Sequence, residues 1–600
     1  MSDFVAPSLG SIDAPRAIPF YFGPEGRKCF GWLHRPASDK ATNLGVVLCN
    51  PLGYDVMCAH RSYRYIATRL AAEGIATVRF DYPSGGDSPG NVDDPDRVAA
   101  WISSIRDACS EIKRHAGVTR LVLFGLRAGG TLAAEAARGI PDLVGFAAWS
   151  PFVSGTLLIR ELRALAGMTS QAEGGTSSII RADGGLHVAG FALSLQTVDD
   201  LQKISLTKLA EPPASCCLLM ARDDLPSDSR LSKHWSAVGS RVLSVTVPGY
   251  AQMMRDAFES SLPLEAVETL TDWVKNLRTP FETHVEVTDL ANQRARVPAA
   301  PGVLEQAEWF GPGLELSGIS SRPESGTPKR TAILFGTVGA NHRIGSNRLH
   351  VEIGRDLARL GYLSLRMDIG GTGDSGQVCE RERFWEYKRD THLDIVEGVE
   401  WLLRQPRVEA VVLWGICSGA YMCYHAALAS ESVSGALLFN LQLFRWREQE
   451  VKENLARGRV KSFAFYARKA VEIPTWRRFL AGSIDVRSIA GGIAARATKR
   501  IKVGLHQMVF GSSGAGLPRH QIAQLSKRGC RLSFVCTPED TGLHEIRIHL
   551  GANASLVSHL PGVEYVEVGQ DTGADHTFTA AAAQHWVKSW TQAQILKYFS

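Results

Sequence analysis

Several features that would assign this chain to a particular class of protein are missing from its 600 residues. The eleven cysteines are an odd number without any Cys-x-x-Cys pair, which argues against a disulfide framework and a structural zinc site. A reducing compartment is expected. The first twenty residues lack a basic segment followed by an apolar core and a small-residue cleavage site, so we predict a cytoplasmic protein without a secretory signal.

Long apolar runs and nucleic-acid-binding motifs are missing as well. One uncharged stretch, Val411 to Ala429, contains two glycines, a serine and a histidine, and it predicts a strand, a turn and a buried helix rather than a membrane span. The whole chain is 45% hydrophobic and 21% charged, a composition typical of a folded protein. The length predicts two to four domains.

The chain contains an internal duplication. The segment Gly74 to Asp81, followed by Gly-Gly-Asp-Ser, recurs 287 positions later as Gly361 to Asp368, followed by Thr-Gly-Asp-Ser. Leu121 to Gly129 likewise corresponds to Val411 to Gly419, at an offset of 290. We therefore predict two domains of similar design, residues 1–280 and 281–600.

Short aliphatic runs alternate with helix-length amphipathic stretches in each half. Examples are the predicted strands Gly45 to Cys49 and Thr77 to Phe80 and the predicted helix Tyr63 to Glu73. This alternation predicts an α/β fold in which a mostly parallel sheet is flanked by helices. Pro280 ends one helical pattern, and the polar stretch from there to Pro301 is predicted to be the linker.

Each half has a strand that runs into Gly-x-X-x-Gly and then into a helix of small residues. This is the nucleophile elbow of the α/β-hydrolases, in which glycines permit a tight turn and the middle side chain projects at the helix N-terminus. The second half has Cys417 at that position. A helix N-terminus favours the reactive thiolate, so Cys417 is the predicted nucleophile; a buried, unreactive cysteine is the alternative.

The hydrolase chain order of nucleophile, acid and base predicts the partners of Cys417. Asp540 ends the next long strand, and His576 follows the strand around Tyr565 to Val568. We predict that His576 is the general base and that Asp540 orients it. His544 and His425 are the rival bases.

Two backbone N–H groups are the predicted oxyanion donors. One belongs to Ser418, directly after the nucleophile, and the other to Val338, in the loop after the first core strand. The polar stretch Asn341 to Arg348 either lines the same cleft or forms a solvated loop and helix cap.

The corresponding positions in the first half are Arg127, Asp224 and Gln252. Arginine is not a nucleophile and glutamine does not shuttle protons, so this half is predicted to be a pseudoenzyme. Arg127 is expected to form an ion pair with Asp224, although it is also suited to gripping a carboxylate or phosphate.

Both halves resemble the α/β-hydrolase superfamily, and more closely the hydrolases that accompany bacterial exosortase and exopolysaccharide gene sets. One type resembles the second half in its Gly-x-Cys elbow and its Gly345 to Arg348 stretch, and the other carries the Gly-Leu-Arg elbow found at Gly125 to Arg127. The resemblance implies a hydrolase or acyltransferase that acts on a surface-polysaccharide or lipid-linked intermediate. Asn347 in the arginine stretch and the fusion of both types in one chain depart from it.

A strongly basic insertion, at about residues 440–530, is predicted to form a cap over the second site. Arg445 to Arg531 contain 19 Lys or Arg against 5 Asp or Glu, a balance of +14, while the whole chain carries +5. The rest of the chain therefore has a net charge of −9. Such a cap favours an anionic substrate or contact with an anionic membrane surface, a solvated helical face being the alternative. The aromatic and basic segment Phe463 to Leu480 suits lipid or an acyl chain.

These observations together predict a cytoplasmic hydrolase of an ester or thioester, working through an acyl group on Cys417. An acyltransferase shares that intermediate, and a non-catalytic scaffold is the competing hypothesis. The expected partner is a small or carrier-linked acyl substrate, not nucleic acid, and neither a metal nor an organic cofactor is implied.

Overall fold

The computed structural model describes residues 15–172, 179–226, 228–255, 257, 260–278, 290, 295–376, 387, 390–445, 517–538 and 540–600. Its contacts divide the chain into two compact units. Unit 1 comprises residues 1–328, 340–381 and 579–592, and unit 2 comprises residues 329–339, 382–578 and 593–600. The second repeat therefore contributes to both units, and the predicted two-domain division at residue 280 stays a prediction.

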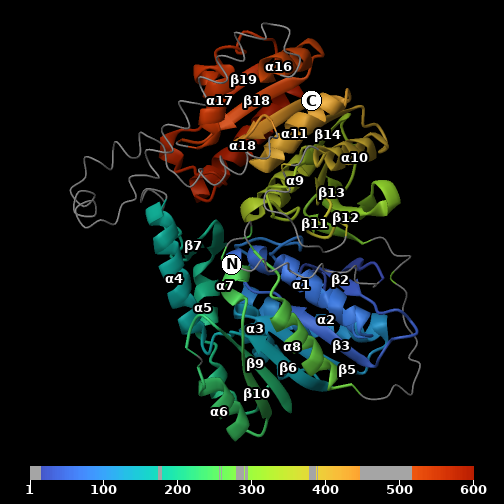
Figure 1. Ribbon diagram of the computed structural model, residues 1–600, viewed down its shortest axis with the longest axis vertical. Coiled ribbons are helices and arrows are strands. Elements are labelled where there is room, and N and C mark those ends of the chain that lie inside the picture. Colours follow the sequence, from blue (N-terminus) through green and yellow to red (C-terminus); the bar gives the residue numbers. More distant parts are fainter. Residues whose placement is uncertain are drawn as a thin grey trace, which may run out of the picture. The chain divides into compact units, whose positions relative to one another are not determined.

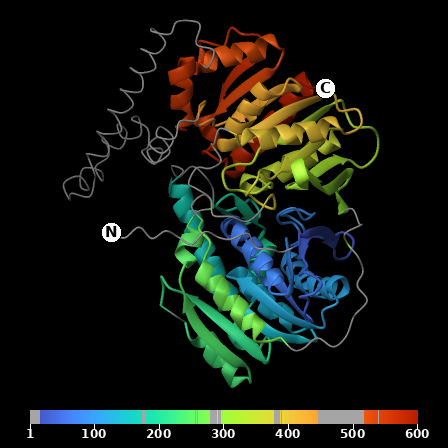
Figure 2. The ribbon, with the colours of Figure 1, turned by 45° about the vertical axis from the view of Figure 1, so that its right-hand side comes forward.

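The first repeat is built on an eight-stranded sheet with the order β1-β2-β4-β3-β5-β6-β9-β10 (Figure 1). The strands β1 and β2 are antiparallel, and all neighbours from β4 to β10 are parallel (Figure 2). The bounds are β1 Ile18–Phe22, β2 Cys29–His34, β3 Leu44–Cys49, β4 Ala76–Phe80, β5 Arg120–Leu126, β6 Leu143–Trp149, β9 Cys216–Arg222 and β10 Arg241–Val247.

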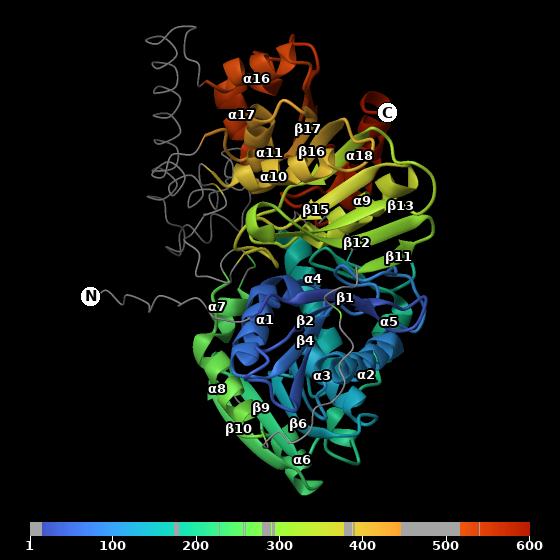
Figure 3. The same ribbon diagram turned by 90° about the vertical axis from the view of Figure 1, so that its right-hand side faces the viewer.

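Helices cover both faces of this sheet, because side chains of a strand point alternately to its two faces. In β5, Leu121 and Leu123 pack into the core with α2 and α3, whereas Val122 and Phe124 pack with α1 and α8. Figure 3 shows the two helix layers on opposite sides of the strands. The bounds are α1 Tyr54–Ala72, α2 Arg97–Ala116, α3 Ala128–Ala137 and α8 Leu264–Lys275.

Additional elements lie between β6 and β9. Their order is α4, β7, β8 and α5, with bounds Gly155–Ala172, Leu186–Val188, Phe191–Leu193 and Leu195–Gln202. The chain then returns to β9 through Leu206–Lys208, a short 3₁₀ turn. The helices α6, Arg230–Ala237, and α7, Tyr250–Met254, flank β10 in sequence.

Four strands of the second repeat belong to unit 1, in the antiparallel order β11-β12-β13-β15. The bounds are β11 Arg296–Ala300, β12 Val303–Phe310, β13 Leu316–Pro323 and β15 Leu363–Met367, with helix α9 at Leu349–Arg359. The predicted linker is wrong at its end, because residues 296–300 form β11. Pro298 suggested a break in the fold, but an edge strand tolerates a proline since one side of it is unpaired.

Unit 2 contains five parallel strands in the order β14-β16-β17-β18-β19. The strand bounds are β14 Thr331–Phe335, β16 Ala410–Ile416, β17 Val433–Phe439, β18 Arg531–Cys536 and β19 Val563–Glu567. The helix bounds are α10 His392–Leu403, α11 Ser418–Ala429, α16 Pro518–Lys527 and α17 Gly542–Leu550, and α18 spans Ala581–Tyr598.

The predicted fold class is confirmed: the chain is a mixed α/β protein with two large, mostly parallel sheets flanked by helices. Within the described ranges, none of the helices is both long and apolar enough to cross a bilayer. Most of the predicted basic cap, at about residues 440–530, and all of Phe463 to Leu480 lie outside the described residues.

Candidate active site

The elbow of the second repeat places Cys417 between the end of β16 and the first residue of α11. Its backbone has φ 57° and ψ −120°, a conformation that is costly for any residue with a side chain and is typical of functional sites. The flanking glycines make the turn possible. A Cβ on Gly415 would lie 2.4 Å from the Gly419 carbonyl carbon, and one on Gly419 would lie 2.8 Å from the Thr337 oxygen.

Asp540 and His576, predicted as acid and base, are brought together at the ends of β18 and β19. The His576 Nδ1 atom lies 2.6 Å from Asp540 Oδ2. The Asp540 side chain is 3% exposed and that of His576 is 36% exposed, so the carboxylate is shielded while the imidazole reaches solvent. Cys417 is only 5% exposed, and its side chain acts on the pKa of His576.

The pKa of His576 is shifted by the side chains around it. Burial alone would lower it, but the Asp540 carboxylate and the Cys417 side chain raise the pKa well above the ordinary histidine value. The protonated imidazole is therefore favoured beside the sulfur. An imidazolium in that position stabilises a neighbouring thiolate, which is the nucleophilic form of cysteine.

Gln442 completes the hydrogen bonding of the acid, and sequence reasoning missed it. Asp540 Oδ1 accepts the Gly542 N–H at 2.7 Å and the Gln442 Nε2 amide at 2.8 Å. The Thr541 hydroxyl donates to the Gln442 side-chain oxygen. The available signal was a polar side chain just after β17, at the carboxyl edge of a parallel sheet, where ligands and catalytic groups gather.

Asn440, also missed, fixes the loop that carries His576. It follows β17 at φ 49° and is completely buried. Its Nδ2 donates to the His576 carbonyl at 2.8 Å, and its Oδ1 accepts the Thr537 N–H at the same distance. One side chain thus ties the histidine loop to the loop that follows β18.

A third missed residue, Tyr387, lies against the nucleophile. Its hydroxyl oxygen is 3.3 Å from Cys417 Sγ, and its ring is completely buried. The ring packs on Tyr421 of α11, with 5.4 Å between centroids. No motif surrounds Tyr387, so only the tertiary structure identifies it.

The loop after β14 lies at the start of α11, where the oxyanion donors are predicted. The Gly339 N–H donates to Ser418 Oγ at 2.7 Å, and Val338 between β14 and this glycine is fully buried. The rival base His425 bonds to the Phe444 carbonyl at 3.0 Å, and His544 lies on α17. The oxyanion roles of Val338 and Ser418 stay predictions.

Arg127 has the same backbone geometry in the first repeat, with φ 51° and ψ −122°, but its guanidinium is fully engaged. Nε donates to Asp55 at 2.6 Å, Nη1 donates to the Tyr250 hydroxyl at 2.8 Å, and Nη2 pairs with Glu161. Two carboxylates already neutralise this cation. Arg127 therefore has no uncompensated positive charge with which to bind the carboxylate or phosphate of a ligand, which was the predicted alternative.

The expected pairing of Arg127 with Asp224 is wrong. Asp224 pairs instead with Arg222, two residues earlier, at 2.5 Å. Gln252, at the base position, is exposed on α7. Spacing along the chain did not reveal Asp55 and Glu161, because both come from other elements, α1 and α4.

The polar stretch Asn341 to Arg348 is largely buried in unit 1. Arg343 makes ion pairs with three aspartates, and Arg348 donates to backbone carbonyls of the first repeat. Of the two alternatives for this stretch, the solvated loop is therefore wrong, and the lining of the cleft stays a prediction. Among the described residues, no three His, Cys, Asp or Glu side chains are grouped so as to hold a metal ion.

Comparisons with known proteins match the chain only through its fold. No family model and no curated protein matches it. Est1E from Butyrivibrio proteoclasticus shares 18% identity, with 43% of this chain and 96% of that chain covered and a TM-score of 0.30. XC6422 from Xanthomonas campestris, a serine hydrolase without a lid, shares 14% identity over 44% and 97%, with a TM-score of 0.30. A proline iminopeptidase from Mycobacterium smegmatis shares 16% identity, with 44% of this chain and 97% of that chain covered and a TM-score of 0.30.

Proposed function

We propose that the protein is a hydrolase of an ester or thioester that works through an acyl group carried on Cys417. The observation that carries the proposal is the 2.6 Å contact between Asp540 and His576, together with the Cys417 side chain on a strained elbow, which raises the pKa of the same imidazole. A nucleophile, a base within hydrogen-bonding reach and a group that orients the base are the parts that covalent catalysis requires.

The residues divide the reaction between them. The Cys417 thiolate attacks the carbonyl carbon of the acyl group, and His576, protonated, gives its proton to the departing alkoxide or thiolate. The negative oxygen of the tetrahedral intermediate faces the backbone N–H groups of Ser418 and Val338. His576 then removes a proton from water, the hydroxide attacks the acyl carbon, and the sulfur leaves as thiolate.

An acceptor other than water would make the same intermediate serve acyl transfer. The basic composition of residues 445–531, with a balance of +14, supports an anionic acyl substrate such as a coenzyme A or phosphopantetheine thioester. The resemblance to hydrolases of exopolysaccharide gene sets adds a lipid-linked or carrier-linked intermediate to the substrates worth testing.

Turnover of a panel of acyl thioesters and activated esters tests the proposal. The wild-type protein should release the leaving group steadily, and Cys417→Ala should reduce the rate at least about 1,000-fold, as loss of a catalytic nucleophile does. Adding glycan, amine or alcohol acceptors then separates transfer from hydrolysis by the products. Equal rates for the wild type and Cys417→Ala would contradict the proposal and favour a scaffold.

A further inference from the structure

The two repeats carry matching loops after β4 and β15. Each loop begins with an aspartate whose carboxylate accepts the backbone N–H of a second aspartate, at 2.9 Å in both cases, Asp87 to Asp81 and Asp374 to Asp368. The serine that follows donates to the carbonyl of the first aspartate, at 2.7 Å and 2.6 Å. The loops are thus built by the same bonds, 287 positions apart.

Each loop is contacted by an arginine of the other repeat, and the two contacts are reciprocal. Arg79 of β4 pairs with Asp374 in the loop after β15, and Arg366 of β15 bonds to Asp87 in the loop after β4 at 2.7 Å. Arg79 and Arg366 are themselves equivalent, because they too lie 287 positions apart. Every one of these four side chains is at most 7% exposed.

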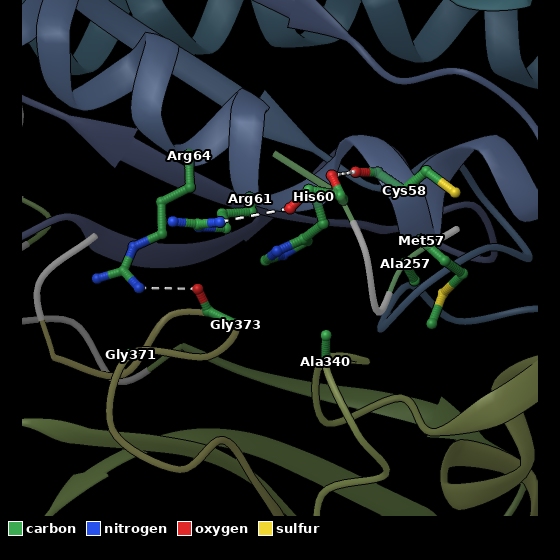
Figure 4. A pocket seen from close by; sticks show the side chains of 10 residues that line it. Met57, Cys58, His60, Arg61, Arg64, Ala257, Ala340, Gly371 and Gly373 are labelled. Atoms are coloured by element: carbon green, nitrogen blue, oxygen red, sulfur yellow. Dashed lines mark hydrogen bonds between the residues drawn. The ribbon is translucent and has the colours of Figure 1, made fainter. Parts of the chain in front are cut away.

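A second pair of contacts repeats the exchange. Arg64, on α1, donates to carbonyls of the loop after β15, which belong to Gly373, Ser375 and Gly376. Arg348, just before α9, donates to carbonyls of the loop after β4, which belong to Gly86 and Ser88, at 2.8 Å and 2.7 Å. Figure 4 shows Arg64 directed from α1 toward the Gly373 carbonyl.

Arg343 breaks the symmetry at the centre of this cluster. It lies 2.8 Å from Asp87, 2.6 Å from Asp368 and 2.7 Å from Asp374, and it is buried. The position 287 residues earlier holds Val56, which provides no cation. The second repeat alone therefore supplies this additional cation, which contacts the aspartates of both loops.

We propose that the first repeat serves as a built-in partner subunit, joined to the second repeat by an interface of the kind found in two-fold symmetric homodimers. In such an interface, residue i of one subunit contacts residue j of the other, and j contacts i in return. The arginine-to-aspartate exchange has this form. The two arginine-to-carbonyl contacts reach equivalent carbonyls, but their donors, Arg64 and Arg348, stand at non-equivalent positions. A repeat whose elbow holds a neutralised arginine is then retained for this contact, and this inference does not depend on the proposed reaction.

Cutting the chain between the repeats tests the interface. A protease site is inserted after Pro280 in the full-length protein, the purified protein is cleaved, and association of residues 1–280 with 281–600 is measured by sedimentation over a dilution series. We expect a 1:1 complex that persists at 1 µM and below, an order of magnitude typical of specific interfaces. Separation of the wild-type fragments at 1 µM overturns the proposal.

Matched substitutions then test the reciprocity. Asp87→Asn and Asp374→Asn each remove a carboxylate that a buried arginine of the other repeat contacts, and each should weaken association at least about 30-fold. Asp142→Asn, in an exposed ion pair with Lys113, is the control and should leave association unchanged. No weakening by either variant, or weakening by only one of them, contradicts the proposal.

Two less disruptive substitutions test the proposal if an asparagine variant does not fold. Arg64→Met and Arg348→Met remove donors to backbone carbonyls without leaving a buried acid unpaired. Each should weaken association at least about 10-fold while circular dichroism of the uncut chain stays unchanged. Unchanged association in both variants overturns the proposal.

Discussion

Replacing Asp540 with asparagine isolates the electrostatic contribution of the carboxylate to the thiol. The substitution keeps the shape and an oxygen that can accept from Gly542, but it removes the negative charge that faces His576 Nδ1 at 2.6 Å. Because Asp540 and Cys417 together raise the pKa of His576 against burial, the pKa should fall when the carboxylate is lost. The imidazolium then persists over a narrower range of pH.

The size of the effect follows from the bond that is lost. A hydrogen bond to a charged group contributes about 1.5–3 kcal/mol, and the lower end applies because the imidazole is 36% exposed and partly screened. About 1.5 kcal/mol corresponds to roughly one pH unit in the pKa of His576, or roughly ten-fold in the stability of the imidazolium.

Alkylation of Cys417 by iodoacetamide, followed by mass spectrometry from pH 5 to 10, measures how strongly the imidazolium supports the reactivity of the sulfur. Cys417 of Asp540→Asn should be alkylated roughly ten-fold more slowly than that of the wild type near pH 7. Asp571→Asn changes an exposed acid in the segment between β19 and His576, and this control should match the wild type. Superimposable profiles of Asp540→Asn and wild type would refute the assignment of Asp540 as the orienting acid.

Three further predictions concern stability and the surroundings of the thiol. Gly419→Ala should lower the free energy of unfolding in urea by about 2 kcal/mol, because its Cβ would lie 2.8 Å and 2.9 Å from two backbone oxygens. Tyr387→Phe should slow alkylation of Cys417 roughly 2- to 10-fold, because one neutral hydrogen bond to the sulfur is lost. Arg127→Met should cost about 2 kcal/mol in thermal or urea unfolding, because it leaves Asp55 and Glu161 without their cation, and should leave the alkylation rate unchanged.

Each of these has an outcome that would count against it. Gly167→Ala is the control for the elbow, since nothing lies within 4 Å of its added Cβ, and a loss as large as that of Gly419→Ala would show that packing at the elbow is not the cause. Alkylation of Cys417 at the wild-type rate in Tyr387→Phe would mean that the Tyr387 hydroxyl does not affect the reactivity of the sulfur. A faster or slower Cys417 reaction in Arg127→Met would mean that the first elbow acts on the second.

The sequence predicted the elbow and its partners because their positions are set locally. A Gly-x-Cys-x-Gly segment between a buried strand and a small-residue helix forms one kind of turn, and the parallel sheet brings the residues after β18 and β19 to one edge. Asp540 and His576 therefore lie in contact, as the chain order implied.

What the sequence did not predict depends on contacts between distant loops. Gln442 and Asn440 follow a strand whose polar ending carries no motif, and Tyr387 has no local pattern at all. Arg127 was expected to pair with an acid at the equivalent triad position, yet Asp55 of α1 lies closer in space. The exchange of arginines between repeats is likewise visible only when both loops are placed together.

In the proposed reaction, Cys417 accepts an acyl group from the substrate, and His576 acts as the base. Intact-mass analysis after incubation with acyl thioesters tests it directly, beside Cys417→Ala and His576→Ala. We predict a mass increase equal to one acyl group on the wild-type protein, absent in Cys417→Ala and slow to form in His576→Ala. An acyl adduct that forms equally in all three proteins, or no adduct with any thioester or activated ester, would contradict the account.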